Sequence, residues 1–286
     1  MNRKEFEIVN LSYRLSSKIL LDNISFTVQE NQKLAILGVN GSGKSLLFDG
    51  ILGNIVCDFD KNSFIEKVHE SGPYGILYDV FASFPLLTVR EIVSLLSIIY
   101  NHKVDNALLE KFCLYELFDK QLKVLSKGEN KKLGIYASLF FEPKVVFMDE
   151  PLDGLDPNSR HLFWDTISCM ECTVIFTTHI WEEVTLHADA VMFIKDGKIL
   201  NNPTPASELI GKYCPFEGKI VLSEIQALLL DSIPYWVHNK LNNEYIFYYT
   251  TDEEKRELLL KFNNNHISNL SILPITLRDV YNYITK

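Results

Sequence analysis

Residues 38–45 combine glycines, a lysine and a serine in an order suited to phosphate binding. They read Gly-Val-Asn-Gly-Ser-Gly-Lys-Ser and fit the pattern G-x-x-x-x-G-K-[ST]. In this pattern, backbone N–H groups converge on an anion, and the start of a helix adds partial positive charge. An apolar stretch precedes the loop and a helix-like stretch follows it, which argues against a plain glycine-serine turn. The residues expected to contact a nucleotide phosphate are Gly38, Asn40, Gly41, Ser42, Gly43, Lys44 and Ser45.

Two acidic residues and a histidine follow apolar segments that predict buried strands. Asp149 and Glu150 directly follow the segment 145–148, and His179 directly follows the segment 173–178. Ligands collect at the carboxyl edge of a parallel sheet. We therefore expect Asp149 and the Ser45 hydroxyl to hold Mg²⁺, Lys44 and His179 to contact the γ-phosphate, and Glu150 to activate a water. The alternatives are a solvated acidic turn and a histidine with an ordinary polar role.

A third feature is Ser126-Lys127-Gly128 at the start of a predicted helix. A helix N-terminus can bind an anion. An ordinary loop is the alternative interpretation.

The elements around these residues predict an α/β fold. Alternating strands over 6–13 and 24–28, with turns at Asp22-Asn23 and Glu30-Asn31, lead into the phosphate-binding loop. From Thr88 the apolar spacing becomes helical, and Glu91 completes a capping box. We expect a P-loop NTPase core sheet with antiparallel N-terminal strands and an α-helical insert at about residues 80–142. A loop at 125–129 should precede a helix at about 130–141.

Pro203-Thr204-Pro205 predicts a domain boundary. Residues 1–204 would form the larger domain, and residues 205–286 a small α+β C-terminal domain. Its last helix, 277–284, would be capped by Thr276 with Asp279.

Composition limits the possible partners. The chain has 286 residues and a formal net charge of −9, and it has no basic stripe, which argues against nucleic acid. Five scattered cysteines and the lack of a signal-peptide pattern predict a reducing compartment. Cys169 and Cys172 could form half a zinc site, but no second pair completes it, so we interpret them as ordinary thiols. No apolar run approaches the roughly 18 residues of a membrane helix.

Taken in order, these motifs resemble the nucleotide-binding subunit of ABC transporters over about residues 5–200. The P-loop matches Walker A, 145–149 matches Walker B, and Leu125-Ser126-Lys127-Gly128-Glu129 lies where the family has Leu-Ser-Gly-Gly-Gln. Asp153-Gly154-Leu155-Asp156-Pro157 is similar to the D-loop. By the same resemblance, Glu150 is the catalytic glutamate, His179 is the switch histidine, and Tyr13 is the ring that stacks on adenine.

The resemblance implies that two such domains close around two ATP molecules, as a homodimer or as a heterodimer with a second ABC ATPase. Ser126 and Gly128 would then act in trans on the partner's nucleotide. The insert would contact a separate polytopic membrane permease through residues 84–89, which places the chain peripherally at the cytoplasmic face of the membrane. The tail is similar to those on ATPase subunits of bacterial exporters for antibiotics, bacteriocins and cell-envelope molecules. A generic dimerisation or packing module is the alternative for the tail.

Two places depart from the family pattern. The family has a glutamine that contacts Mg²⁺ and relays to the membrane subunit, whereas this chain has Asp79 there. We expect Asp79 to offer oxygen to Mg²⁺ and to give slower or differently coupled turnover. Lys127 and Glu129 replace the first glycine and the glutamine of the signature loop. Lys127 would either add positive charge near the nucleotide or be solvated.

Three other functions compete with a transport ATPase. A regulatory ABC module would bind ATP but hydrolyse it weakly. Asp79 and the altered signature loop favour this interpretation, whereas the presence of Glu150 and His179 argues against it. An ABC ATPase acting on DNA or ribosomes would need coiled-coil arms or tandem ATPase domains, which this chain lacks. A small-molecule kinase would leave Ser126-Lys127-Gly128 and the D-loop-like stretch without a role.

Overall fold

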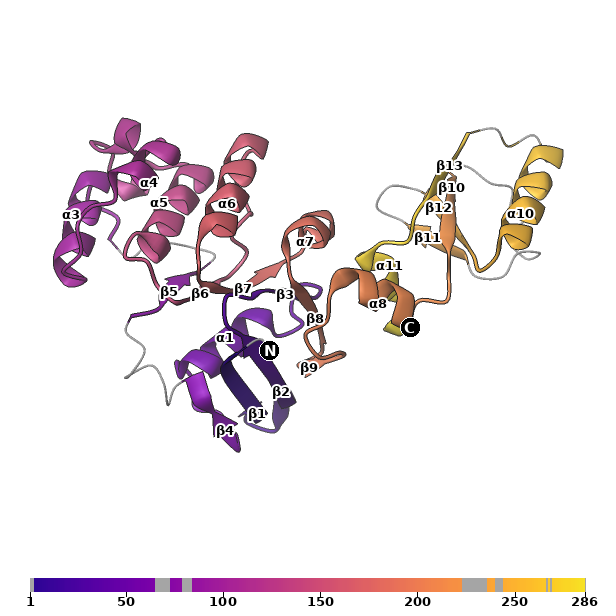
Figure 1. Cartoon of the computed structure of the whole chain (residues 1–286), viewed down its shortest axis with the longest axis horizontal. Helices are drawn as coiled ribbons and strands as arrows, with labels where there is room; N and C mark the ends of the chain where they lie inside the picture. Colours follow the sequence, from indigo (N-terminus) through magenta and orange to yellow (C-terminus); the bar gives the residue numbers. More distant parts are fainter. Residues whose placement is uncertain are drawn as a thin grey trace. The chain divides into compact units, whose positions relative to one another are not determined.

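The computed structural model describes residues 3–64, 73–78, 84–222, 236–239, 244–265, 267 and 269–285. The chain divides into two compact units, which we name unit 1 (Met1–Ala206) and unit 2 (Ser207–Lys286). Figure 1 labels the helices and strands of each unit.

A six-stranded sheet forms the centre of unit 1. Its order is β5-β6-β7-β3-β8-β9, and all neighbours are parallel except β8 and β9. The strands are β3 (Lys33–Leu37), β5 (Gly75–Leu77), β6 (Val145–Met148), β7 (Thr173–Thr178), β8 (Ala190–Lys195) and β9 (Lys198–Ile199). Every residue of β6 and β7 is buried, as their continuous apolar sequences predict for a sheet covered on both faces. The parallel order brings the carboxyl ends of β3, β6 and β7 to one edge.

An antiparallel sheet of order β2-β1-β4 completes the N-terminal part, as the sequence predicted. Its strands are β1 (Lys4–Leu15), β2 (Lys18–Gln29) and β4 (Lys61–Asn62), and helix α1 (Lys44–Leu52) follows the phosphate-binding loop. Phe147 of β6 contacts Phe48 of α1 at a ring-centroid distance of 5.4 Å and Phe6 of β1 at 6.1 Å. One apolar core therefore fixes α1 and the loop before it against both sheets.

The turn expected at Asp22-Asn23 is wrong. The chain reverses at residues 16–17, and β2 runs through Asp22 and Asn23. These two residues lie between the pairs Leu11–Ile24 and Tyr13–Leu21, opposite the single residue Ser12, and Asn23 has a φ of 50°. Asparagine tolerates this left-handed conformation in bulges as well as in turns, so its position in the sequence did not distinguish the two.

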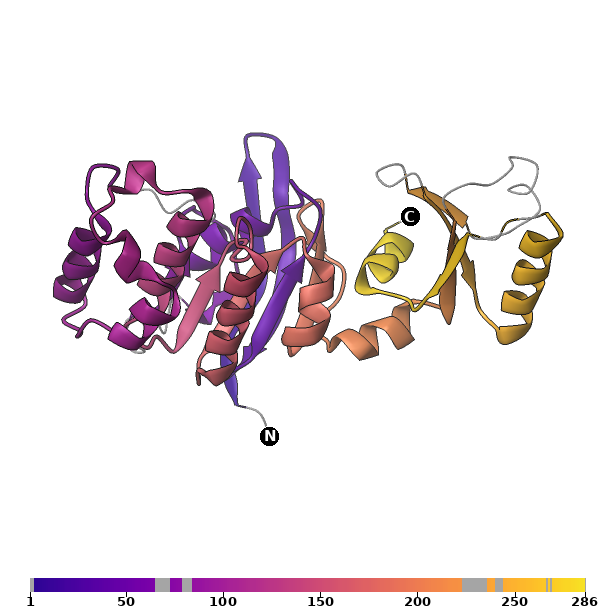
Figure 2. The same cartoon turned by 90° about the horizontal axis from the view of Figure 1, so that it is seen from above.

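The helical insert lies between β5 and β6, as predicted. It contains α3 (Val89–Ile99), α4 (Asn106–Lys111), the 3-10 turns η1 (Leu114–Leu117) and η2 (Leu122–Val124), and α5 (Lys127–Leu139). Figures 1 and 2 both show α3, α4 and α5 grouped beside the β5 end of the sheet. The Thr88–Glu91 capping box is present. Helix α5 begins about three residues earlier than expected, because Ser126 and Glu129 form a second capping box.

Helices α6 (Pro157–Cys169) and α7 (Trp181–His187) follow β6 and β7. Unit 2 holds a four-stranded antiparallel sheet of order β11-β12-β10-β13, with the helices α8 (Ala206–Tyr213), α10 (Asp252–Asn264) and α11 (Leu277–Ile284). The strands are β10 (Gly218–Leu222), β11 (Trp236–Asn239), β12 (Glu244–Tyr249) and β13 (Leu270–Leu273). Thr276 and Asp279 cap α11 as predicted. Within the described residues, no helix is both long and apolar enough to span a bilayer.

Candidate functional site

A cleft of about 600 Å³ opens at the carboxyl edge of the six-stranded sheet. Its lining joins the phosphate-binding loop, the end of β6 and the end of β7. The lining residues are Leu20, Asn40, Gly41, Gly43, Lys44, Ser45, Leu46, Asp149, Glu150, Asp153 and His179. The fold thus collects most of the predicted phosphate, metal and catalytic residues in one place.

The loop backbone needs glycine at the positions where the sequence has it. Gly41 has a φ of 79° and Gly43 a φ of 108°, a region that other L residues rarely adopt. A Cβ at Gly38 would lie 2.5 Å from the Ile194 carbonyl oxygen, so the loop packs directly on β8. Ser42 is buried, and its Oγ has no hydrogen-bond partner among the described residues. A buried orphan hydroxyl within such a loop is consistent with a ligand-binding role.

The Lys44 ammonium lies between the loop and the acidic end of β6. Its Nζ donates to the carbonyl oxygens of Gly38 at 2.9 Å and Val39 at 3.3 Å. The same Nζ is 3.7 Å from Glu150 Oε1, and the Lys44 side chain is only 7% exposed. Lys44 therefore places a buried positive charge in the wall of the cleft.

Thr177 of β7 joins the two acidic residues at the end of β6. Its hydroxyl donates to Asp149 Oδ1 and accepts the Glu150 backbone N–H at 3.0 Å. Asp149 is 5% exposed and Thr177 is fully buried. One buried hydroxyl thus holds the Asp149 carboxylate and the Glu150 backbone against β7.

The side chains of Glu150 and His179 contact each other directly in the cleft wall. His179 Nδ1 lies 2.9 Å from Glu150 Oε2, and the His179 backbone N–H donates to the same oxygen at 3.2 Å. Glu150 has a φ of 46°, and its carbonyl accepts from Lys131 Nζ of α5 at 2.9 Å. A non-glycine residue with positive φ at a cleft is a common feature of functional sites.

Ser126 and Gly128 are not among the described residues that line this cleft. Ser126 caps α5 by accepting the Glu129 N–H at 3.2 Å. Gly128 packs on the D-loop-like stretch, where an added Cβ would lie 2.7 Å from the Gly154 carbonyl oxygen. Their action on a partner's nucleotide stays a prediction.

Tyr13 is not among the described residues that line the cleft. Tyr13 is partly buried and packs against the apolar core, and Leu20 of β2 lines the cleft nearby. Asp79 lies outside the described residues. The roles of both remain predictions.

Sequence reasoning missed Thr177 and the part that Asp153 plays in the cleft lining. Thr177 belonged to a strand interpreted only as apolar support. Asp153 belongs to the D-loop-like stretch, and its charge next to the predicted site was the signal that could have identified it. Asp153 has a pKa below its usual range because the Lys127 ammonium contacts its carboxylate at 2.6 Å.

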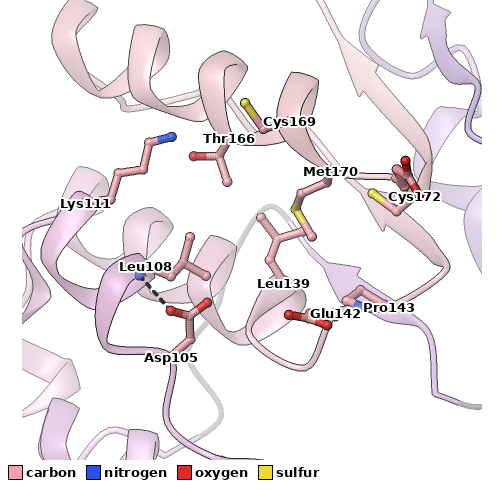
Figure 3. Close-up of a pocket in the computed structure, with 11 residues that line it drawn as sticks. Asp105, Leu108, Lys111, Leu139, Glu142, Pro143, Thr166, Cys169, Met170 and Cys172 are labelled. Carbon is pink, nitrogen blue, oxygen red and sulfur yellow. Dashed lines mark hydrogen bonds between the residues drawn. The ribbon is translucent and has the colours of Figure 1, made fainter.

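A second cavity, of about 460 Å³, lies between α4 and the ends of α5 and α6 (Figure 3). Cys169 and Cys172 both line it, the first exposed and the second buried. Burial raises the pKa of the Cys172 thiol. The described residues hold no group of three or more His, Cys, Asp or Glu placed to bind a metal ion. This cavity contains none of the predicted site residues.

Comparison with known proteins supports the motif assignment. The family described as "ABC transporter" matches residues 21–153. The chain is 30% identical over 224 residues to an energy-coupling factor transporter ATP-binding protein, EcfA1, of Leuconostoc mesenteroides, covering 71% of this chain and 82% of that protein. It is 27% identical to Nod factor export ATP-binding protein I of Rhizobium sp. strain N33, over 100% of this chain and 98% of that protein.

Other relatives are much longer than this chain. The chain is 29% identical over 214 residues to the mouse cholesterol transporter ABCA5; the match covers 67% of this chain but only 13% of that protein. Among solved structures, CbiO1 from Clostridium perfringens, part of the ABC transporter complex CbiONQ, superposes with a TM-score of 0.58 at 27% identity. That match covers 73% of this chain and 92% of CbiO1. On these matches, the chain belongs to the ABC transporter family of ATP-binding proteins.

Proposed function

We propose that this chain hydrolyses ATP and energises transport, in the export direction, through a separate polytopic membrane subunit. The observation that carries the proposal is the juxtaposition of Glu150 with His179 and Lys44 at one cleft, at 2.9 Å and 3.7 Å. In this arrangement Glu150 takes a proton from the attacking water, and His179 holds the Glu150 carboxylate in position. Lys44 stabilises negative charge on the transferred phosphoryl group.

The remaining site residues bind and orient the nucleotide. The loop residues Gly38, Asn40, Gly41, Ser42 and Gly43 surround the phosphates, and Tyr13 stacks on adenine. In a dimer of two ATPase chains, identical or paralogous, Ser126 and Gly128 complete the partner's site. The helix start at Ser126 supports an anion-binding role, because the N-terminus of a helix carries partial positive charge.

The oxygens of Ser45 and Asp149 fit a hard cation such as Mg²⁺. Both residues line the same cleft, and Asp149 is buried and held by Thr177. Protein sites for Mg²⁺ commonly supply only one or two oxygen ligands and leave the rest to phosphates and water. When bound, the ion neutralises phosphate charge. Asp79 is proposed as a further oxygen ligand.

Export is favoured because the Nod factor export ATPase matches this chain over its full length, including unit 2. We therefore place the chain at the cytoplasmic face of the membrane, in a bacterial exporter similar to those for antibiotics and bacteriocins. Purification of the tagged chain from gently solubilised membranes should recover a polytopic membrane protein in stoichiometric amount. Recovery of the chain without any membrane partner, under several detergents, would contradict this part of the proposal.

Hydrolysis is tested by the Glu150→Gln variant. Loss of the general base should lower ATP turnover by about 10²- to 10⁴-fold while nucleotide binding persists. Glu182→Gln is the matched control, because Glu182 is an exposed glutamate three residues after His179. Its turnover should equal that of the wild type. A wild-type chain that binds ATP without turnover would favour the regulatory module instead.

A further inference from the structure

The signature-loop lysine, Lys127, forms an ion pair with a residue that lines the chain's own cleft. Its Nζ lies 2.6 Å from Asp153 Oδ2. Lys127 and Asp153 are 58% and 37% exposed, so the pair is partly open to solvent. Asp153 lines the cleft together with Asp149 and Glu150. The lysine that replaces the family's glycine is therefore neither free in solvent nor directed only outward.

Close backbone packing holds this pair in place. Gly154 has a φ of 81°, and an added Cβ there would lie 3.0 Å from Lys127 Cγ. A Cβ added at Gly128 would lie 2.7 Å from the Gly154 carbonyl oxygen, and Lys131 donates to the Glu150 carbonyl at 2.9 Å. The first turn of α5 and the segment 150–156 thus contact one another at several points.

The Lys127–Asp153 ion pair changes the balance of charge around the cleft. Three carboxylates line the cleft, but Lys44 is the one lysine among the described lining residues. An uncompensated Asp153 would repel the phosphates of a nucleotide, and this repulsion would weaken with salt. Lys127 is not among the described lining residues, yet its ammonium contacts the Asp153 carboxylate directly at 2.6 Å, and Lys131 adds a more distant positive charge.

We propose that Lys127 is a positioning residue that neutralises Asp153 and thereby sets the affinity of the chain's own cleft for Mg-ATP. The inference rests on the proposed function, because it assumes that the cleft holds the nucleotide phosphates. It also links the signature loop, which would act on the partner's nucleotide, to the chain's own site.

The test is a double-mutant cycle on the full chain, read as the Kd of Mg-ATP in equilibrium dialysis. Lys127→Met should weaken binding about threefold to fivefold, as expected for a partly exposed ion pair. Asp153→Asn should leave binding equal or tighter. In the double variant the effect of Lys127→Met should disappear, because there is no carboxylate left to neutralise.

A salt series and a control variant make the double-mutant cycle more specific for the Lys127–Asp153 ion pair. The effect of Lys127→Met should shrink between about 50 mM and about 500 mM salt, because screening shortens the range of charge repulsion. Arg90→Met removes a different ion pair, Arg90–Asp119 at 3.0 Å, on the exposed surface of the insert. That variant should bind Mg-ATP as the wild type does.

Each outcome decides a separate claim. If Lys127→Met weakens binding equally with and without Asp153, Lys127 acts directly on a nucleotide and the inference is overturned. If the wild type binds Mg-ATP but does not hydrolyse it, the proposed hydrolysis fails while the cycle still decides the role of Lys127. If the wild type does not bind Mg-ATP, both proposals are overturned.

Discussion

Lysine and aspartate side chains meet in both units, in surroundings that differ. In unit 2, Asp279 Oδ2 accepts from Lys219 Nζ at 2.6 Å and from the backbone N–H and hydroxyl of Thr276 at 2.8 and 2.6 Å. Its Oδ1 accepts from the Tyr248 hydroxyl at 2.8 Å. Asp279 is only 5% exposed and anchors α11 to β10 and β12.

In unit 1, the charged residues instead border an open cleft. Lys44 contacts loop carbonyls and lies 3.7 Å from Glu150, while Asp149, Glu150 and Asp153 face the same space. Residue type alone does not separate a functional cluster from a structural one. A network whose hydrogen-bonding capacity is satisfied within the protein stabilises the fold, whereas one beside a cavity can bind a ligand.

The largest effect on the unit 2 network should follow from Asp279→Asn. The variant leaves the Lys219 ammonium buried without its carboxylate, and removing one partner of such a pair costs about 3–5 kcal/mol. Hydrogen exchange on the full chain should show loss of amide protection in β10 and α11. Glu253→Gln, an exposed residue of α10, is the control and should leave protection unchanged. Unchanged protection in Asp279→Asn would show that the network does not hold unit 2 together.

The sequence predicted the local features of both clusters better than their long-range contacts. The P-loop, the buried strand ends and the Thr276–Asp279 cap are local patterns, and the structure has them. The ion pairs Lys127–Asp153 and Lys219–Asp279 join residues 26 and 60 positions apart. Their partners depend on tertiary packing, which periodicity and capping rules do not contain. The turn predicted at Asp22-Asn23 was wrong for a different reason, because the local signal of an asparagine fits both a turn and a bulge.

A smaller effect in the cleft should follow from Thr177→Val. The valine keeps the shape of the side chain but removes the hydroxyl that holds Asp149 and the Glu150 N–H, at a cost of about 1–3 kcal/mol. ATP turnover should fall by about tenfold to a hundredfold, with less effect on folding than Asp279→Asn has. Thr178→Val is the matched control, because the Thr178 hydroxyl accepts the Ile180 N–H at 3.1 Å and contacts neither acid. Equal losses in both variants would mean that Thr177 has no special part in the site.

The smallest effect should come from acidification. Burial alone would raise the pKa of Asp279, but hydrogen bonds from Lys219 and Thr276 outweigh it and hold the pKa below its usual value of 3.8. A carboxyl with a depressed folded-state pKa stabilises the fold above its unfolded pKa and loses this contribution as the pH falls through the folded value. Protection of β10, corrected for intrinsic exchange, should therefore decline below about pH 4. The Asp279→Asn variant should lack this component, and an identical decline in that variant would contradict the assignment.

ATP turnover by the wild type, Glu150→Gln and Asp279→Asn, measured side by side with Mg-ATP binding, tests the central claim most directly. Our account predicts ATP turnover in the wild type and loss of turnover with retained Mg-ATP binding in Glu150→Gln. Asp279→Asn should still turn over ATP under conditions in which unit 1 stays folded. Wild-type turnover in Glu150→Gln would contradict the account, because the chemistry would then lie outside the cleft formed by β3, β6 and β7.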